Sequence, residues 1–213
     1  MSEDPLALAD WRRRVTELYA LIRDEADPVR AWNDWRETRD TLFREHSQSP
    51  LQAEDRGRFE GLRYFDYDPS FRVLGQVESA PATRYEIATS GEGTLTFTRF
   101  AWVGFELHGR SLELELYWLA GYGGGIYLPF RDATSGTETY GAGRYLLDTV
   151  KGADLGKDGH ALVLDFNFAY NPSCAYNPRW LCPLAPPENR LDVELRAGEL
   201  EPLTRGGGPQ APS

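Results

Sequence analysis

The stretch Val103-Gly104-Phe105-Glu106-Leu107-His108-Gly109-Arg110-Ser111-Leu112-Glu113-Leu114-Glu115-Leu116 decides the fold class of this chain. Apolar residues occupy every second position in both halves of the stretch, on either side of the turn sequence His108-Gly109-Arg110. Because successive side chains of a strand point to opposite faces, each half predicts a strand with one buried face and one face in water. Together the two halves predict an antiparallel hairpin.

The alternation continues outside this hairpin. Leu95 and Phe97 lie on the same parity as Val103, although Arg99 and Ala101 interrupt the pattern. Further short strands are indicated at residues 85–89, 126–131, 145–150, 161–166 and 191–196. Short strands separated by Gly, Pro and Asp residues are typical of β-sandwiches and barrels. We therefore predict a mainly β protein, folded as an antiparallel β-barrel or sandwich.

The first 46 residues carry a helical pattern instead. Asp4-Pro5 and Asp27-Pro28 each combine a helix N-cap with proline at the first helical position. Apolar residues recur at helical spacing after each start, at Leu8, Trp11, Val15, Leu18, Tyr19 and Ile22 and then at Val29, Trp32, Trp35, Leu42 and Phe43. We expect two N-terminal α-helices packed on the β part, with a partner-binding helix pair as the alternative.

These patterns divide the chain into three segments. We expect an N-terminal helical arm over residues 1–48, a β domain over residues 49–201 and a disordered tail over residues 202–213. The tail is rich in glycine and proline and has little to bury. The hydrophobic content of 41% is enough to fill a core in the remainder.

Charge and the N-terminal sequence limit the partners and the compartment. The net charge of −10 argues against nucleic acid or an anionic membrane as the main partner. Met1-Ser2-Glu3-Asp4-Pro5 is acidic and lacks the features of a signal peptide, and no stretch approaches the length of about 18 apolar residues that a membrane span requires. We expect a cytoplasmic protein in which Cys174 and Cys182 are reduced thiols.

Residues 165–191 form a proline-rich loop. They contain five prolines and both cysteines of the chain, among several aromatic residues. Proline excludes a helix or a central strand here, and the aromatic content argues against a solvated linker. We expect a long loop pinned against the body of the protein, and long ordered loops are usually functional.

The hairpin formed by residues 130–145 is the second candidate region. A turn at residues 133–137 would bring Arg131 and Arg144 near each other, beside the permissive glycines Gly141 and Gly143. Two arginines in this setting suit bidentate recognition of a carboxylate or phosphate. The alternative is that the arginines form buried structural ion pairs with Asp132, Asp165 or Glu188.

The carboxylates and thiols of the loop allow several roles. Asp165 and Glu188 lie in aromatic, proline-rich sequence, where a raised pKa would suit acid–base chemistry. Cys174 and Cys182 could be a nucleophile with a resolving partner, metal ligands or apolar packing residues. A structural zinc site needs four ligands, and no histidine lies at a recognisable spacing from the cysteines. We therefore expect no metal site and no cofactor.

The blocks Phe130–Tyr145 and Asp165–Leu191 resemble a bacterial and archaeal family of unknown function. Ser49-Pro50-Leu51 and Gly61-Leu62-Arg63-Tyr64-Phe65 are similar to its upstream motifs. The resemblance covers about residues 40–198 and implies no particular activity. Some members of that family carry secretion or lipoprotein signals, which the acidic N-terminus of this chain does not resemble.

From these residues we expect the 130–145 hairpin and the 165–191 loop to meet around a pocket that binds a small polar or anionic ligand. The ligand-binding candidates are Arg131, Asp132, Thr139, Tyr140, Arg144, Asp165, Asn167, Tyr170, Asn171, Cys174, Cys182, Glu188 and Asn189. The alternatives are a hydrolase or lyase that uses Asp165, Glu188 or Cys174, and a scaffold that contacts another protein. The sequence identifies neither catalytic residues nor an oligomeric state.

Overall fold

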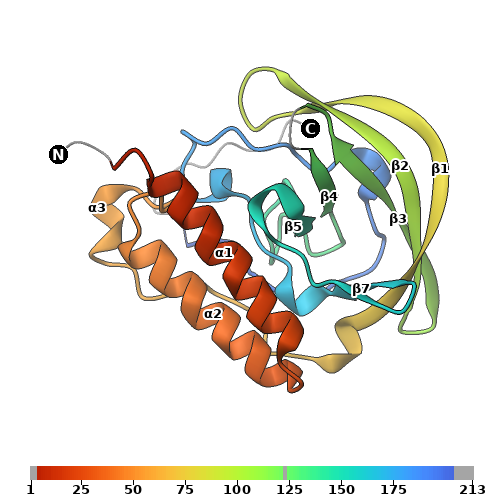
Figure 1. Cartoon of the computed structure of the whole chain (residues 1–213), viewed down its shortest axis with the longest axis horizontal. Coiled ribbons are helices and arrows are strands. Elements are labelled where there is room, and N and C mark those ends of the chain that lie inside the picture. Colours follow the sequence, from red (N-terminus) through yellow and green to blue (C-terminus); the bar gives the residue numbers. More distant parts are fainter. Residues whose placement is uncertain (1–3, 122–123, 204–213) are drawn as a thin grey trace.

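The computed structural model describes residues 4–121 and 124–203. Within these residues, seven strands form one antiparallel sheet in the order β5-β4-β3-β2-β1-β7-β6. The strands are β1 (Arg72–Ala88), β2 (Thr94–Leu107), β3 (Arg110–Leu119), β4 (Gly125–Phe130), β5 (Arg144–Asp148), β6 (Lys157–Asp158) and β7 (Ala161–Asp165). The helices are α1 (Ala7–Asp24), α2 (Pro28–Glu45) and the short α3 (Ala53–Arg56). Helices α1 and α2 lie side by side on one side of the molecule, and β1 to β3 curve along the other (Figure 1).

The predicted fold class is confirmed: the protein is mainly β and antiparallel, with two N-terminal helices. Strands β5 and β6 form the two edges of the sheet, which does not close into a barrel. The sandwich-like alternative is therefore the one that fits. None of the three helices in the described ranges is long and apolar enough to cross a membrane.

The predicted hairpin at residues 103–116 forms. Val103 pairs with Leu114, and both side chains are buried, whereas Glu113 on the opposite face is exposed. His108 and Gly109 form the turn with φ values of 49° and 75°. Positive φ at both central residues gives a tight turn whose twist matches that of the two strands.

The interruption of the alternation at Arg99 and Ala101 is a β-bulge. The register between β2 and β3 shifts between these two residues, so that Arg99 pairs with Tyr117 and Ala101 pairs with Leu116. An extra residue in one strand breaks the period of two without ending the strand. This is the physical reason that the sequence pattern stops and resumes.

The predicted strand at residues 191–196 does not form. This segment is irregular, with bends at residues 192 and 193, and it lies beside residues 131–133 instead of joining the sheet. The N–H of Leu191 donates to the carbonyl of Arg131 (2.8 Å), and the N–H of Ala133 donates to the carbonyl of Val193 (2.9 Å). The strand prediction is therefore wrong, because the backbone of this segment pairs with a loop and not with a strand.

The second helix begins where the sequence predicts. The Asp27 carboxylate accepts hydrogen bonds from the N–H groups of Val29 (3.0 Å) and Arg30 (3.4 Å), and Pro28 is the first helical residue. Helix α1 begins at Ala7, slightly later than the Asp4-Pro5 signal indicates.

The helices and the sheet share one hydrophobic core. Trp35 of α2 is fully buried, and its ring centroid lies 5.2 Å from that of Phe168 and 5.4 Å from that of Tyr64. Leu18 and Ile22 of α1 belong to the same apolar cluster as the sheet residues. Most of the expected tail, residues 202–213, lies outside the described residues.

Candidate functional site

The 130–145 hairpin and the 165–191 loop meet, as the sequence predicts. Tyr145 and Tyr170 exchange two backbone hydrogen bonds, of 2.9 and 3.1 Å, and Arg131 forms a parallel bridge with Arg190. The side chain of Tyr170 is buried against the ring of Tyr145, with the ring centroids 5.8 Å apart. The contact is thus made by backbone pairing and aromatic packing.

Arg144 lies inside this contact and is fully buried. Its Nη2 is 3.3 Å from Oδ1 of Asp132, which is also buried, and donates to the carbonyl of Leu195 at 3.0 Å. Its Nη1 donates to the carbonyl of Ala197. All of these partners are groups of the protein itself. Arg144 therefore forms a buried structural ion pair with Asp132, which is the alternative to ligand binding that the sequence left open.

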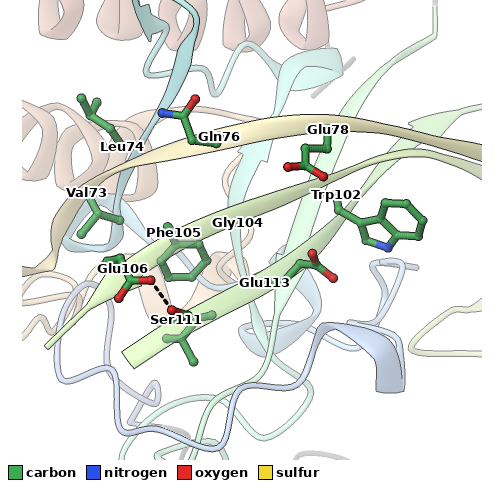
Figure 2. Close-up of a pocket in the computed structure, with 11 residues that line it drawn as sticks. Val73, Leu74, Gln76, Glu78, Trp102, Gly104, Phe105, Glu106, Ser111 and Glu113 are labelled. Atoms are coloured by element: carbon green, nitrogen blue, oxygen red, sulfur yellow. Dashed lines mark hydrogen bonds between the residues drawn. The ribbon is translucent and has the colours of Figure 1, made fainter. Parts of the chain in front are cut away.

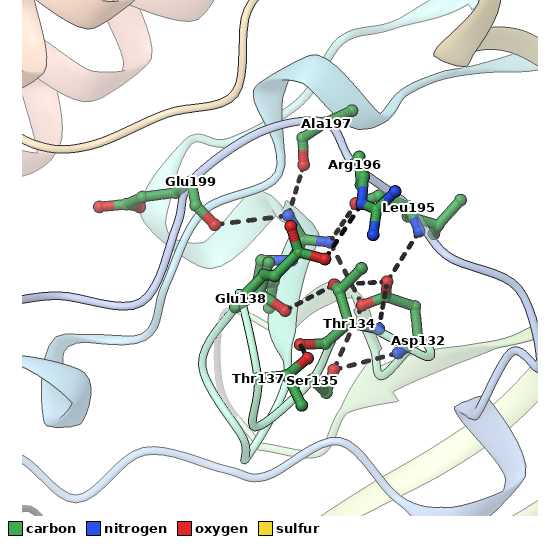
Figure 3. Close-up of polar contacts among 11 residues, drawn as sticks. Asp132, Thr134, Ser135, Thr137, Glu138, Leu195, Arg196, Ala197 and Glu199 are labelled. Atoms are coloured by element: carbon green, nitrogen blue, oxygen red, sulfur yellow. Dashed lines mark hydrogen bonds and ion pairs between the residues drawn. The ribbon is translucent and has the colours of Figure 1, made fainter.

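The Asp132 carboxylate organises the turn of the hairpin. Its Oδ2 accepts hydrogen bonds from the N–H of Leu195 (2.8 Å) and from the hydroxyl of Thr134 (2.7 Å), as Figure 3 shows. Thr139 is fully buried, and its hydroxyl lies 2.9 Å from that of Thr134. Through the hydrogen bond from Leu195, the Asp132 carboxylate connects the hairpin to the segment that follows the proline-rich loop.

Asn189 and Glu188 have different surroundings. Asn189 is buried, and its side chain hydrogen-bonds to the backbone of β3 and β4 where the two strands no longer pair with each other. The side-chain oxygen accepts from the N–H of Glu115 (2.8 Å), and the side-chain nitrogen donates to the carbonyls of Glu115 (3.0 Å) and Pro129 (2.7 Å). Glu188 is exposed. The apolar surroundings that we expected for Glu188 are absent because its side chain points to water.

Asn171 belongs to a buried polar cluster around Glu199, a residue that sequence analysis did not select. The Glu199 carboxylate accepts from the N–H of Asn171 (2.8 Å), from Arg39 of α2 (2.9 Å) and from the hydroxyl of Tyr176. Burial raises the pKa of Glu199 to about 7, although Arg39 opposes the rise. Glu199 lies outside the two sequence blocks, Phe130–Tyr145 and Asp165–Leu191, so its contacts with Arg39 and Asn171 are evident only in the folded structure.

Asp165 is the candidate whose setting suits chemistry. It ends β7, pairs with Arg72 of β1 and is 2% exposed. Oδ1 accepts from the backbone N–H (3.0 Å) and the side-chain amide (2.8 Å) of Asn167, and Oδ2 lies 3.8 Å from Nε of Arg72. Burial raises the pKa of Asp165 to about 6, against the opposing effects of Asn167 and Arg72.

Asn167 holds this carboxyl in place. Its side-chain amide donates to Asp165 and to the carbonyl of Asp68 (2.8 Å), while its own amide oxygen accepts from the N–H of Asp68 (3.0 Å). Trp32 of α2 donates to the Asn167 carbonyl at 3.1 Å. Asn167 is fully buried, so it orients Asp165 and is not free to contact a ligand.

A hollow of about 450 Å³ opens beside Asp165. It lies between the adjoining ends of α1 and α2 and strands β1, β6 and β7, and its charged lining comprises Arg23, Glu25, Arg72, Lys157, Asp158 and Asp165. Burial and the Asp165 charge raise the pKa of Tyr67 to about 12, although Tyr67 does not itself line the hollow. Neither Arg72 nor Tyr67 is among the candidates predicted from the sequence.

A second hollow, of about 700 Å³, lies on the outer face of β1, β2 and β3 (Figure 2). Gly104 leaves open space at its centre, and Glu78, Glu106 and Glu113 surround it. All three carboxylates are exposed. The Asp165 hollow is the stronger candidate because it combines a buried carboxyl of raised pKa with cationic side chains, Arg72 and Lys157, in its lining. Residues 130–145 line neither hollow.

Tyr140, Cys174 and Cys182 form a separate cluster. The Tyr140 hydroxyl lies 3.8 Å from Sγ of Cys174, and the N–H of Cys174 donates to Sγ of Cys182 at 3.4 Å. Both cysteines are free thiols and are buried. The candidates selected from the sequence therefore divide into several sites instead of lining one pocket.

Comparison with known proteins places the chain among uncharacterised relatives. A family model described as "Protein of unknown function (DUF1684)" matches residues 57–200. The solution NMR structure of an uncharacterised protein from Haloarcula marismortui is similar, with 38% identity and a TM-score of 0.57, over 79% of this chain and 91% of that one. No curated protein matches. The family match includes Arg72, Asp165 and both cysteines.

Proposed function

The chain belongs to the DUF1684 family of unknown function, and we propose that it binds a small polar ligand with an anionic group in the Asp165 hollow. Because the family implies no activity, this role is inferred from the side chains of the chain itself. The observation that carries this proposal is the buried Asp165 carboxyl, whose pKa is raised to about 6 at the wall of a hollow that Arg72 also lines. A strongly perturbed carboxyl in a concave site is typical of functional sites.

The cations of the hollow can accept an anionic group. Arg72 is 44% exposed, and its Nε is 3.8 Å from Asp165, which is too long for a hydrogen bond. Lys157 is exposed and forms no ion pair within the described residues. Arg23, in contrast, already donates to the carbonyl of Asp154 at 2.6 Å. Arg72 and Lys157 are therefore the side chains available to a carboxylate or phosphate.

Oδ2 of Asp165 gives the hollow a further polar group. Both hydrogen bonds from Asn167 end on Oδ1, so Oδ2 receives neither of them. A ligand that hydrogen-bonds to Oδ2 would therefore not have to displace Asn167.

We expect Arg72→Ala to remove most of the stabilisation that a bound ligand provides. The measurement is differential scanning fluorimetry of the wild type against a library of small carboxylates and phosphates, since a ligand at 100 times its Kd adds about 2.7 kcal/mol of stability. Arg84→Ala is the matched control, because Arg84 lies on the same strand, is 72% exposed at its side chain and is outside the hollow.

The proposal fails if a hit stabilises Arg72→Ala as much as it stabilises Arg84→Ala. Equal loss of stabilisation in both variants would also contradict it, because that result indicates a general charge effect. If no carboxylate or phosphate of the library stabilises the wild type, the hollow does not bind a ligand of the proposed class.

A hydrolase or lyase is the second candidate function, because a carboxyl with a pKa of about 6 can donate or accept a proton near neutral pH. In that case Asp165→Asn would retain binding of the hit and lose its conversion. We also propose a cytoplasmic location, in keeping with the two free thiols. The net charge of −10 supports a small-molecule partner over nucleic acid.

A further inference from the structure

Cys174 and Cys182 bring two thiols together on opposite arms of a short loop. The N–H of Cys174 donates to Sγ of Cys182 at 3.4 Å. Their side chains are buried, with the residues 5% and 4% exposed. The Cys182 sulfur thus contacts the backbone of Cys174, and only seven residues separate the two cysteines along the chain.

The β1–β2 hairpin holds Cys182 in this position. The N–H of Cys182 donates to Oγ of Ser90 (3.1 Å), and the N–H of Ser90 donates to the carbonyl of Cys182 (2.9 Å). The next residue, Pro183, forms a bridge with Thr89. Residues 182 and 183 are thus both bonded to the end of a long hairpin, which fixes the position of Cys182.

The two sulfurs have different surroundings, which gives them different chemical roles. The neighbouring Cys182 thiol and the Tyr140 hydroxyl, 3.8 Å from Sγ, lower the pKa of Cys174 in spite of burial. The neighbouring Cys174 sulfur, together with burial, raises the pKa of Cys182. Cys174 is therefore the more readily ionised of the two thiols, and the thiolate is the nucleophilic form.

We propose that Cys174 and Cys182 form a reversible oxidation site for hydroperoxides, with Cys174 as the reacting thiolate and Cys182 as the resolving thiol. The Cys174 sulfur attacks one peroxide oxygen and breaks the O–O bond, which gives a sulfenic acid and, after proton uptake, water or an alcohol. The Cys182 sulfur then attacks the sulfenic sulfur, forms the S–S bond and releases water. In sum, two thiols and one hydroperoxide give one disulfide and two molecules of water, or one of water and one of alcohol.

Access to the thiols depends on the loop that covers them, residues 175–181. Leu181 of this loop is 62% exposed, but Ala175 and Asn177 are buried, and the Tyr176 hydroxyl donates to Glu199. A small oxidant therefore reaches Cys174 only when this loop opens locally, which does not require unfolding of the sheet.

The test is oxidation of the reduced full-length protein with one equivalent of hydrogen peroxide at pH 7, followed by unfolding, alkylation with N-ethylmaleimide and intact mass measurement. We expect the wild type to lose both titratable thiols and to gain one disulfide within a single chain. Cys182→Ser should stop at a sulfenic acid that dimedone traps, and Cys174→Ser should keep its remaining thiol.

Tyr140→Phe should slow the loss of thiols several-fold, because it removes the hydroxyl 3.8 Å from Cys174. Two free thiols in the peroxide-treated wild type would overturn the proposal, as would a disulfide that joins two chains. The wild-type measurement does not depend on the folding of any variant. It is also independent of ligand binding at the Asp165 hollow, so the two proposals can fail separately.

Discussion

Arg144→Ala is expected to lower the free energy of unfolding by about 3–5 kcal/mol, because it leaves the buried Asp132 carboxylate without its cation. The pair is fully removed from water, with both side chains 0% exposed and Nη2 3.3 Å from Oδ1. The variant also frees the carbonyls of Leu195 and Ala197, which accept hydrogen bonds from the guanidinium. Each buried acceptor that loses its donor adds to the loss.

Urea unfolding of the wild type and Arg144→Ala measures this effect. Arg196→Ala is the control, because Arg196 also pairs with a carboxylate of the hairpin, Glu138 at 3.0 Å, but is 54% exposed. An exposed ion pair contributes about 0–1 kcal/mol, so the control should remain close to the wild type. A near-neutral Arg144→Ala would mean that Arg144 is not a structural residue and would return it to the list of ligand-binding candidates.

Arg39→Ala should have a comparable effect, about 3–5 kcal/mol, at a second buried ion pair, whose carboxylate belongs to Glu199. Arg39 of α2 lies 2.9 Å from Glu199, and the side chains are 13% and 1% exposed. Without Arg39 the Glu199 carboxyl would remain buried with hydrogen bonds from Asn171 and Tyr176 only. The double variant Arg39→Met/Glu199→Leu should recover much of the loss, since apolar residues of similar volume can replace a buried ion pair.

This experiment also tests whether the helices and the sheet unfold together. Arg30→Ala is the control on the same helix, because the Arg30–Glu25 pair has an arginine side chain that is 70% exposed. We expect a single urea transition in every variant, since Trp35 and Leu18 belong to the same core as the sheet. A separate early transition of the helices in Arg39→Ala would contradict a shared core.

Local patterns in the sequence were sufficient to predict the elements whose hydrogen bonds form within one short stretch of chain. The 103–116 hairpin follows from its alternation and its turn, and the start of α2 follows from Asp27-Pro28. The segment 191–196 was misassigned because its partner is the backbone of residues 131–133 and not a neighbouring strand. Partners that are distant in sequence leave no local signature.

The same limit applies to the site. Asp165 and Asn167 were selected because they lie in aromatic, proline-rich sequence, and the structure places Asp165 at a hollow. Arg72 faces Asp165 only because β1 pairs with β7 in one register, which no local pattern specifies. Among three candidate carboxylates for Arg144, the sequence could not select Asp132, since the choice depends on how the hairpin turn folds back.

The raised pKa of Asp165 has a consequence for stability with a definite sign. A carboxyl whose pKa is higher in the folded than in the unfolded protein stabilises the fold at low pH, and this contribution is lost as the pH rises through the folded value. For Asp165 the loss falls between about pH 4 and pH 6, and a rise from 3.8 to about 6 corresponds to about 3 kcal/mol. Asp165→Asn should remove this part of the pH dependence, and Glu199 should keep its own part up to about pH 7.

The most direct test of the Asp165 hollow as the functional site is an NMR titration of the Asp165 side-chain carboxyl carbon in the free protein. Assignment of the signal comes from its absence in Asp165→Asn. A buried carboxyl that is poised for ligand binding or proton transfer near neutral pH should titrate with a midpoint of about 6. A midpoint near the ordinary value of 3.8 would mean that water or Arg72 stabilises the charge fully, and it would contradict the account.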